Sequence, residues 1–211
     1  MTTFDSTKAS LSDLLREIKE GKIQLPDFQR GWVWDDDHIR DLLVSIARSF
    51  PIGAVMLLEA GGEVRFETRP VEGLEDLVPK GQVPEKLILD GQQRLTTLTQ
   101  ALSLNAPVQT RTAKGKRIQR HYYFDIRKAV EAPHALEEAI VAVDENRQLR
   151  SNFGRDIELD LSTTELECQQ LHFPCSQILG SDDWEATLHR VAPKHFALYM
   201  AFRSQVLTPF R

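Results

Sequence analysis

The sequence predicts an α+β fold, in which a small mixed sheet packs with helices and a mainly helical part follows. A short apolar run that begins at Leu87 ends at Asp90 and Gly91, and leucines then recur at helical spacing. This pattern predicts a buried strand that turns directly into a helix. Helical spacing of apolar residues also appears twice before residue 51 and again from Trp184 onward, which supplies the helical component of the fold.

The first 50 residues are expected to form two helices on either side of a strand and a loop. Ser10 is expected to cap a first helix that ends at Gly21. Residues 22–34 contain an internal proline and glycine, which exclude a helix and favour a strand followed by a loop. Aspartates at residues 35–37 suit the positive end of a second helix, which stops before Pro51.

The middle of the chain is expected to alternate strands and loops. Alternating polarity on both sides of a Gly-Gly pair predicts a β-hairpin over residues 55–69. Residues 70–84 are rich in turn-forming residues and predict a surface loop, and the polar, basic residues 110–121 predict a flexible loop. The elements expected next are a strand at 122–126, a helix at 135–143, a loop at 146–154 and helices from Trp184 to Val206.

Composition places the chain among soluble globular proteins. Its 211 residues are 41% hydrophobic and 27% charged, which is ordinary for such proteins and enough for a substantial core. Because no apolar run has membrane-spanning length and only Cys168 and Cys175 are present, we expect a cytoplasmic protein without a membrane partner or a disulfide framework. A net charge of −5 argues against a general nucleic-acid coat.

The turn Asp90-Gly91-Gln92-Gln93-Arg94, called the DGQQR turn below, has the composition of an anion site. A helix start carries unpaired N–H groups and partial positive charge, which suits a phosphate. Arg94 adds a planar cation that matches phosphate oxygens. Asp90 either holds a metal ion or a water, or simply caps the helix. The two glutamines and the arginine favour a ligand, because a plain cap requires none of them.

Aromatic residues surround an arginine in the segment LPDFQRGWVW, residues 25–34. On an extended chain Arg30 shares a face with Phe28 and Trp32. Flat rings can stack on a nucleobase while Arg30 binds phosphate. In the structural alternative the aromatics belong to the core and Arg30 pairs with a neighbouring aspartate. We favour the core for Trp34 and a functional role for Arg30, whereas Gln29 suits a ligand and a turn equally.

Other positions have two interpretations each. Gly53, at the end of the PIG triplet, allows close approach of the backbone to a ligand or makes an ordinary turn. The hydroxyl groups of Thr96 and Thr97 can reach a phosphate or bond to their own helix backbone. Both cysteines are expected to be small apolar fillers. The six histidines are scattered, so a structural zinc site is not expected.

Several motifs together resemble a known family. LPDFQRGWVW, the PIG triplet at residues 51–53, DGQQRLTTL and YYFDI at residues 122–126 occur in this order. They resemble the N-terminal domain of GmrSD-type, modification-dependent restriction proteins, in the ParB/sulfiredoxin superfamily. The resemblance is strongest over residues 10–130. It implies a ParB/sulfiredoxin-like nucleotide-binding domain at residues 1–130 and a mainly helical segment at 131–211, which we expect to be cut short at its C-terminus.

The resemblance also implies a function, the binding and hydrolysis of a nucleoside triphosphate with Mg²⁺ by a regulatory domain of a phage-restriction system. Asp90, Gln92, Gln93 and Arg94 would act at the phosphates, with Asp90 as a metal ligand. The nucleotide contacts expected beside them are Phe28, Gln29, Arg30, Trp34, Gly91, Thr96 and Thr97. The chain has no P-loop motif, so such an activity would not be of the P-loop kind. The turn has no cysteine, so sulfiredoxin chemistry is not expected.

Full-length relatives carry a C-terminal nuclease domain of the HNH type, so DNA is expected to be engaged through that domain or a partner subunit.

Two alternatives to the nucleotide-hydrolysing function remain open. The chain is alternatively a non-catalytic DNA-binding or adaptor module, whose footprint would be the basic run Lys114, Lys116, Arg117 and Arg120. A ParB-like clamp, in which a nucleotide gates association into a homo-oligomer, is a further possibility.

Overall fold

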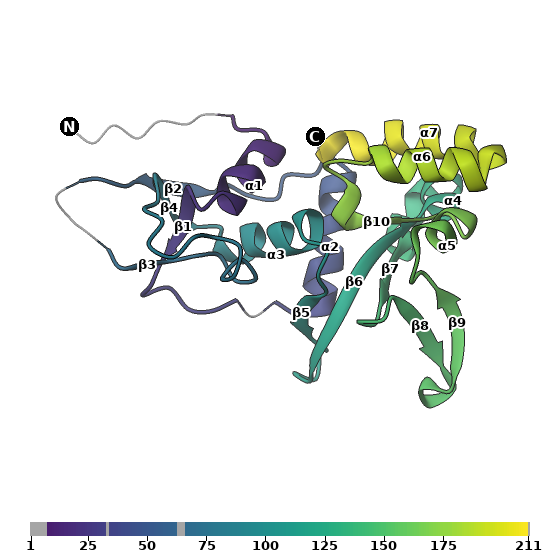
Figure 1. Cartoon of the computed structure of the whole chain (residues 1–211), viewed down its shortest axis with the longest axis horizontal. Helices are drawn as coiled ribbons and strands as arrows, with labels where there is room; N and C mark the ends of the chain where they lie inside the picture. The colour runs from purple at the N-terminus through teal and green to yellow at the C-terminus, as the bar shows by residue number, and fades with distance from the viewer. Residues whose placement is uncertain (1–7, 33, 63–65, 211) are drawn as a thin grey trace.

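The computed structural model describes residues 8–32, 34–62 and 66–210 (Figure 1). Its N-terminal half contains a four-stranded mixed sheet with the strand order β2-β4-β1-β3. The two central strands, β1 and β4, are parallel, and the edge strands are antiparallel to their neighbours. The bounds of the strands are β1 Ile23–Pro26, β2 Met56–Glu59, β3 Thr68–Arg69 and β4 Lys86–Asp90.

Three helices accompany this sheet, α1 (Leu11–Lys19), α2 (Asp36–Ala47) and α3 (Gln92–Ser103). The Ser10 hydroxyl caps α1 and the Asp35 carboxylate caps α2, each accepting a hydrogen bond from a backbone N–H of the first turn. α1 packs against β1 and α3. All side chains from Leu95 to Leu102 in α3 are buried, so this helix lies inside the molecule rather than on its surface.

A second sheet is built around β6, the longest strand. Its first half pairs with β5, and its second half pairs with β7 and β10, all antiparallel. A separate two-stranded sheet, β8-β9, projects beside it (Figure 1). The bounds are β5 Val108–Arg111, β6 Arg117–Asp125, β7 Ile140–Val143, β8 Gln148–Ser151, β9 Asp156–Asp160 and β10 His172–Pro174.

Aromatic side chains join the second sheet to the C-terminal helices. Phe124 of β6 lies 5.7 Å from Phe202, and Phe173 of β10 lies 5.0 Å from Trp184, measured between ring centroids. The buried Phe210 also packs against Phe124. The helices concerned are α4 Ile126–Glu131, α5 Thr164–Gln169, α6 Asp182–Val191 and α7 Phe196–Phe202, with further helical turns over residues 203–210.

The predicted α+β class is confirmed, and the mixed sheet with its helices is compatible with a ParB/sulfiredoxin-like domain. The first two helices, the strand after Gly21 and the strand-turn-helix around the DGQQR turn all form as predicted. The second helix ends earlier than predicted, at Ala47, and Phe50 lies outside it with 57% of its surface exposed. Cys168 and Cys175 are buried and not disulfide-bonded, as expected for small core residues.

The predicted hairpin over residues 55–69 is wrong. β2 pairs with β4 and β3 pairs with β1, so the two strands lie at opposite edges of the sheet. Alternating polarity identifies a strand that has one exposed face, but it does not identify the neighbouring strand. Residues 63–65, which the predicted turn includes, lie outside the described residues.

Three predictions downstream are wrong as well. Residues 110–121 form most of an antiparallel hairpin, β5-β6, rather than a flexible loop. The predicted helix at 135–143 is a 3₁₀ segment, Pro133–Ala139, followed by β7, because the β-branched run Ile140–Val143 pairs with β6. The predicted loop at 146–154 contains β8. The C-terminal part is mainly helical, as predicted, and also includes the short strands β9 and β10.

The predicted division at residue 130 stays a prediction. Strands from both sides of it, β6 on one side and β7 and β10 on the other, share one sheet. One cluster of buried hydrophobic side chains extends from Leu15 to Phe210. Within the described ranges, no helix combines the length and apolar character needed to span a bilayer.

Candidate functional site

The two motifs of the sequence meet at one edge of the first sheet. The segment at residues 25–34 follows β1, and the DGQQR turn follows β4. These strands are parallel neighbours, with Ile23 opposite Lys86 and Gln24 opposite Leu87. The chain therefore leaves both strands at the same edge, which is where open sheets with parallel strands bind their ligands.

Gly91 makes the turn from β4 into α3. Its φ angle of 88° lies in the left-handed region, which glycine adopts at no steric cost. No side chain caps the start of α3, and its first turn contains no acidic residue. Asp90 does not cap the helix, because its carboxylate is 73% exposed and lies 3.6 Å from Nη2 of Arg94. The start of α3 thus keeps the partial positive charge of a helix terminus.

The glutamines of the two motifs bind the opposite segment through backbone carbonyl groups. Nε2 of Gln92 donates to the carbonyl oxygen of Arg30 at 2.6 Å, and Nε2 of Gln93 donates to that of Gly31 at 3.4 Å. In return, Nε2 of Gln29 donates to the carbonyl oxygens of Ile88 at 2.7 Å and Leu89 at 3.1 Å. Gln29 and Gln92 therefore lock the segment at residues 25–34 against β4 and α3, and Gln92 itself is buried.

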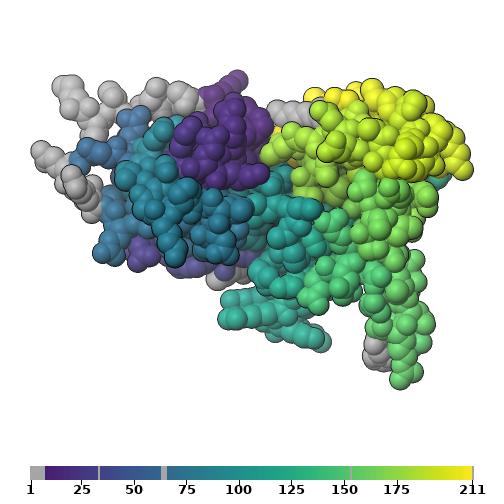
Figure 2. Space-filling model, in the orientation of Figure 1, coloured from purple at the N-terminus to yellow at the C-terminus, as the bar shows by residue number. Residues whose placement is uncertain are grey.

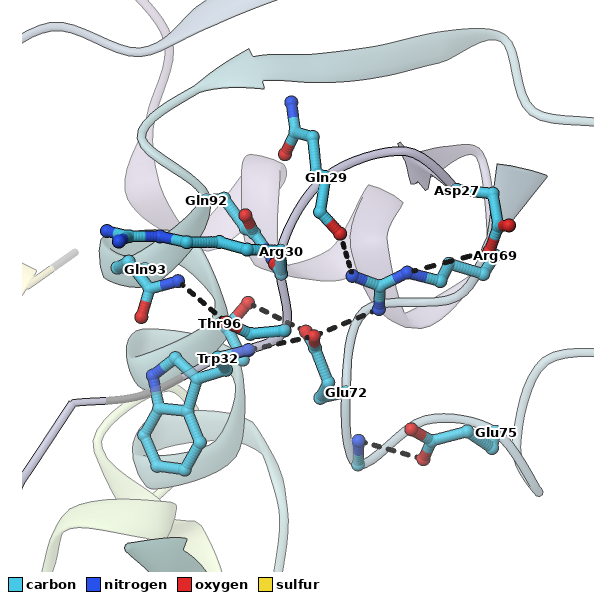
Figure 3. A network of polar contacts seen from close by, with 12 residues as sticks. Asp27, Gln29, Arg30, Trp32, Arg69, Glu72, Glu75, Gln92, Gln93 and Thr96 are labelled. Carbon is cyan, nitrogen blue, oxygen red and sulfur yellow. Dashed lines mark hydrogen bonds and ion pairs between the residues drawn. The ribbon is translucent and has the colours of Figure 1, made fainter. Parts of the chain in front are cut away.

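The carboxylate of Glu72 organises the same loop from the other side (Figure 3). Its Oε1 accepts hydrogen bonds from Nη1 of Arg69 at 2.9 Å and from the backbone N–H of Trp32 at 3.1 Å. Its Oε2 accepts from the Thr96 hydroxyl at 3.4 Å. Arg69 also donates to the carbonyl oxygen of Gln29 at 3.3 Å. Glu72 thus links a loop, the first motif and α3 at a single point.

Arg94 is directed toward the PIG triplet rather than toward solvent. Its Nη1 donates to the carbonyl oxygen of Ile52, and its Nη2 donates to that of Ala54 at 2.8 Å. Gly53 lies between these two residues with a φ angle of 92°, and a Cβ atom there would overlap with Nη1 of Arg94. Arg94 and Gly53 therefore form one unit, in which the glycine is required by the position of the guanidinium.

The threonines of the motif helix face inward. Thr96 and Thr97 are both fully buried. Thr96 binds Glu72, and the Thr97 hydroxyl accepts a hydrogen bond from the indole N–H of Trp32 at 3.0 Å. In this arrangement their hydroxyl groups hold the loop and do not face solvent. Trp34 is half-buried and packs against the core, in agreement with the structural interpretation of this residue.

Phe28 and Arg30 are exposed side chains of the first motif, as is Asp27. Phe28 is 68% exposed and contacts Phe66, with ring centroids 5.6 Å apart. Phe28 therefore does not belong to the core, whereas Trp32 is half-buried and packs against it. The neighbouring aspartates do not neutralise Arg30, since Asp27 lies 4.0 Å from Arg69 and Asp35 binds His38 at 2.7 Å.

Within the described ranges, the Arg30 guanidinium has neither an ion pair nor a hydrogen-bond partner. In Figure 3 its side chain extends away from the Glu72 contacts, on the side where Gln93 lies. The site thus combines an unpaired cation, an uncapped helix start and an exposed carboxylate at Asp90. These are the groups that an anion with an associated cation would engage.

Mg²⁺, which the family resemblance implies, fits Asp90 only in part. Among the residues described here, no three His, Cys, Asp or Glu side chains are grouped to hold a metal ion. Mg²⁺ in nucleotide sites is held by phosphates together with one or two carboxylates. The exposed carboxylate of Asp90 therefore suits a cation that arrives with the phosphates, and does not suit a resident metal ion.

A hollow of about 660 Å³ is lined by residues of the same sheet and of the loop before β4. Its lining includes Leu58, Phe66, Val83 and Leu87 but no residue of the DGQQR turn. The hollow adjoins the first motif at Phe66, which contacts Phe28. Elsewhere, burial raises the pKa of Glu167 in α5 to about 7 and lowers that of His121 in β6 to about 4.

Glu72 and Arg69 are site residues that the sequence reasoning missed. They fall in a stretch read as hairpin and surface loop, and they are three residues apart. An arginine and a glutamate at this spacing are common in exposed segments, so no pattern separates them from ordinary surface charge. Only the fold, which places residue 72 beside α3, reveals their role.

Comparison with known proteins identifies the family of the chain. A family model described as the N-terminal domain of the GmrSD restriction endonuclease matches residues 11–183, which include both motifs. The chain is also similar to an uncharacterized protein, MJ0686, from Methanocaldococcus jannaschii, with 29% identity over 193 residues. That similarity covers 89% of this chain and 31% of the relative, so the chain spans about a third of its length. The chain therefore belongs to the family of GmrSD restriction endonuclease N-terminal domains.

Proposed function

We propose that this domain binds a nucleoside triphosphate at the DGQQR turn and hydrolyses it, as the regulatory part of a restriction system directed at phage DNA. The supporting observation is the position of Arg30. Its backbone carbonyl is bound by Gln92, whereas its guanidinium has no partner among the described residues. A fixed backbone that carries an unpaired arginine beside an uncapped helix start suits a multiply charged anion.

The residues divide into those that would contact the nucleotide and those that hold the site. Arg30 and the start of α3 would bind phosphate oxygens, and Asp90 would contact Mg²⁺ carried by the phosphates. Gln93, at the first turn of α3, would orient the attacking water. The exposed ring of Phe28 would stack on the base. Gln92, Arg94, Thr96 and Thr97 bind backbone or neighbouring side chains, so they would keep these groups in place.

Arg30→Ala is the direct test, because this exposed side chain has no partner whose loss would disturb the fold. The chain with Mg²⁺ is titrated with each of the four ribonucleoside triphosphates, and phosphate release is then measured. Loss of a charged hydrogen bond is worth about 1.5–3 kcal/mol. We therefore expect Arg30→Ala to weaken binding of the preferred triphosphate by about 10- to 150-fold.

The matched control is Arg127→Ala, which removes an equally charged, exposed side chain from α4. This variant is expected to bind and hydrolyse like the unmodified chain. A folded Arg30→Ala variant with unchanged affinity and turnover would contradict the assignment. Asp90→Asn tests the metal contact separately, and is expected to raise the Mg²⁺ concentration required for turnover while the affinity for metal-free triphosphate is kept or increased.

A further inference from the structure

The β5-β6 hairpin is a well-formed ribbon. Four residue pairs join its strands, from Val108 opposite Arg120 to Arg111 opposite Arg117. The turn is closed by hydrogen bonds from the backbone N–H of Thr112 to the carbonyl oxygen of Lys116 at 2.9 Å and from that of Gly115 to Thr112 at 2.8 Å. Gly115 has a φ angle of 80°, as expected for the left-handed position of a three-residue hairpin loop.

The charge of this ribbon is entirely positive. No acidic residue occurs between Asp90 and Asp125, although the whole chain has a net charge of −5. None of the cations of the ribbon makes an ion pair with a described carboxylate. Elsewhere most arginines of the chain are paired, for example Arg48 with Glu137 at 2.6 Å. The unpaired cations are Arg111, Lys114, Lys116, Arg117 and Arg120.

The pairing register concentrates polar donors on one face. Val108 and Thr110 are buried, so Gln109 and Arg111 point to the exposed face. Their cross-strand partners, Gln119 and Arg117, share that face. Like charges directly opposite each other destabilise a hairpin. The Arg111–Arg117 pair therefore weakens the isolated ribbon, and an anionic partner would remove that repulsion.

The ribbon also projects from the body of the protein. Figures 1 and 2 show its tip extending beyond the body of the protein, on the same side as the β8-β9 hairpin. A two-stranded ribbon has the width that the major groove of duplex DNA accepts. Arginine and glutamine are the side chains that bind guanine and adenine edges in that groove, and lysine and arginine bind the flanking phosphates.

We propose that the β5-β6 hairpin is a nucleic-acid-binding arm, which lies in a groove of a duplex with Gln109, Arg111, Arg117 and Gln119 facing the bases and the lysines of the turn at the phosphates. The arm is separate from the DGQQR turn and does not depend on triphosphate binding. An acidic protein surface fits the cations equally well, but it gives no role to the opposed pair of glutamines.

The test measures binding of the full chain to a fluorescent duplex of 20 base pairs by anisotropy over a series of salt concentrations. The variant is Arg111→Gln/Arg117→Gln, which changes exposed strand positions only. The control is Arg127→Gln/Lys128→Gln in α4, which removes the same charge from exposed positions. We expect the first variant to bind about tenfold more weakly or worse, with the slope of log Kd against log salt reduced by about two.

The control is expected to bind like the unmodified chain. The proposal is overturned if the unmodified chain does not bind the duplex, if both double variants lose the same affinity, or if polyglutamate at equal charge competes as well as unlabelled duplex. This last result would assign the ribbon to an acidic protein. Triphosphate turnover is expected to be unchanged in Arg111→Gln/Arg117→Gln, so failure of the arm is distinguishable from failure of the nucleotide site.

Discussion

Glu72 offers the sharpest test of how the two motifs are held together. Its carboxylate binds Arg69, the backbone N–H of Trp32 and the Thr96 hydroxyl, and only about a fifth of its side chain is exposed. Glu72→Gln keeps the shape and one acceptor oxygen but removes the charge. Glu72→Ala removes every acceptor and leaves the donors of Arg69 and Trp32 facing an empty space.

The expected losses follow from these contacts. A hydrogen bond to a charged group contributes about 1.5–3 kcal/mol and a neutral one about 0.5–1.5 kcal/mol. Glu72→Gln turns the Arg69 contact from the first kind into the second, so we expect a loss of about 1–2 kcal/mol in the free energy of unfolding. Glu72→Ala leaves two donors unpaired, so we expect the free energy of unfolding to fall by about 3–4 kcal/mol. Since a domain of this size shifts by about 2–4 °C per kcal/mol, the Tm falls accordingly.

The free energies are measured by urea denaturation, with Glu75→Gln and Glu75→Ala as matched controls. Glu75 lies in the same loop but is exposed and accepts a single hydrogen bond, from the backbone N–H of Gly73 at 2.8 Å. Its variants are expected to lose at most about 0.5 kcal/mol. Equal losses at positions 72 and 75, or a Glu72→Gln variant as unstable as Glu72→Ala, would refute the reasoning. The Glu72 variants should also bind the triphosphate more weakly, although residue 72 does not itself contact the ligand.

Three further changes have definite expected outcomes. Gly53→Ala adds a Cβ atom to a left-handed backbone and displaces the end of the Arg94 side chain, so it should lower the free energy of unfolding by about 1–3 kcal/mol. A Tm equal to that of the unmodified chain would contradict this expectation. Thr97→Val keeps the packing but leaves the indole N–H of Trp32 without an acceptor, so the free energy of unfolding measured in urea should fall by about 1–2 kcal/mol. A variant that is equally stable and loses only triphosphate binding would show that this hydroxyl faces the ligand. Burial raises the pKa of Glu167 from its ordinary value of 4.5 to about 7. The protonated carboxyl group therefore favours folding below pH 4.5, and this contribution to stability is lost as the pH rises to 7. The free energy of unfolding of the unmodified chain, relative to that of Glu167→Gln, should fall by about 3 kcal/mol between these two pH values, and a difference that stays constant would contradict this prediction.

Local sequence patterns predict much of the fold. Ser10, the aspartates at residues 35–37 and Gly91 mark where helices begin, because capping and turn formation depend on a few adjacent residues. The strand-turn-helix at the DGQQR turn is local in the same sense. Its neighbours in space, Arg30 and Gly31, are about 60 residues earlier in the chain, and only the family resemblance brought the two motifs together.

The failed predictions concern pairing partners. Residues 55–69 have the alternation of a hairpin, yet each strand pairs with a different central strand. Residues 110–121 look like a flexible loop because polar and basic residues dominate, whereas buried Val108 and Thr110 anchor them as a ribbon. The role of Glu72 was missed because it binds residues on three different segments, Trp32, Arg69 and Thr96, which only the fold brings together. The bonds of Arg94 to backbone carbonyl groups of residues 52 and 54 are likewise not visible in any side-chain pattern.

The parallel pairing of β1 with β4 has a consequence for how the protein acquires its structure during synthesis. β1 is followed by more than 40 residues before β3 and about 60 before β4, and these are its sheet neighbours. Contacts between distant segments form late and slow folding, because a long loop must close first. A nascent chain that ends before Thr68 therefore exposes the strand Ile23–Pro26 with neither neighbour, and one that ends before Lys86 still lacks its parallel neighbour β4. Ribosome-bound intermediates of this length are the species in which we expect aggregation or chaperone binding.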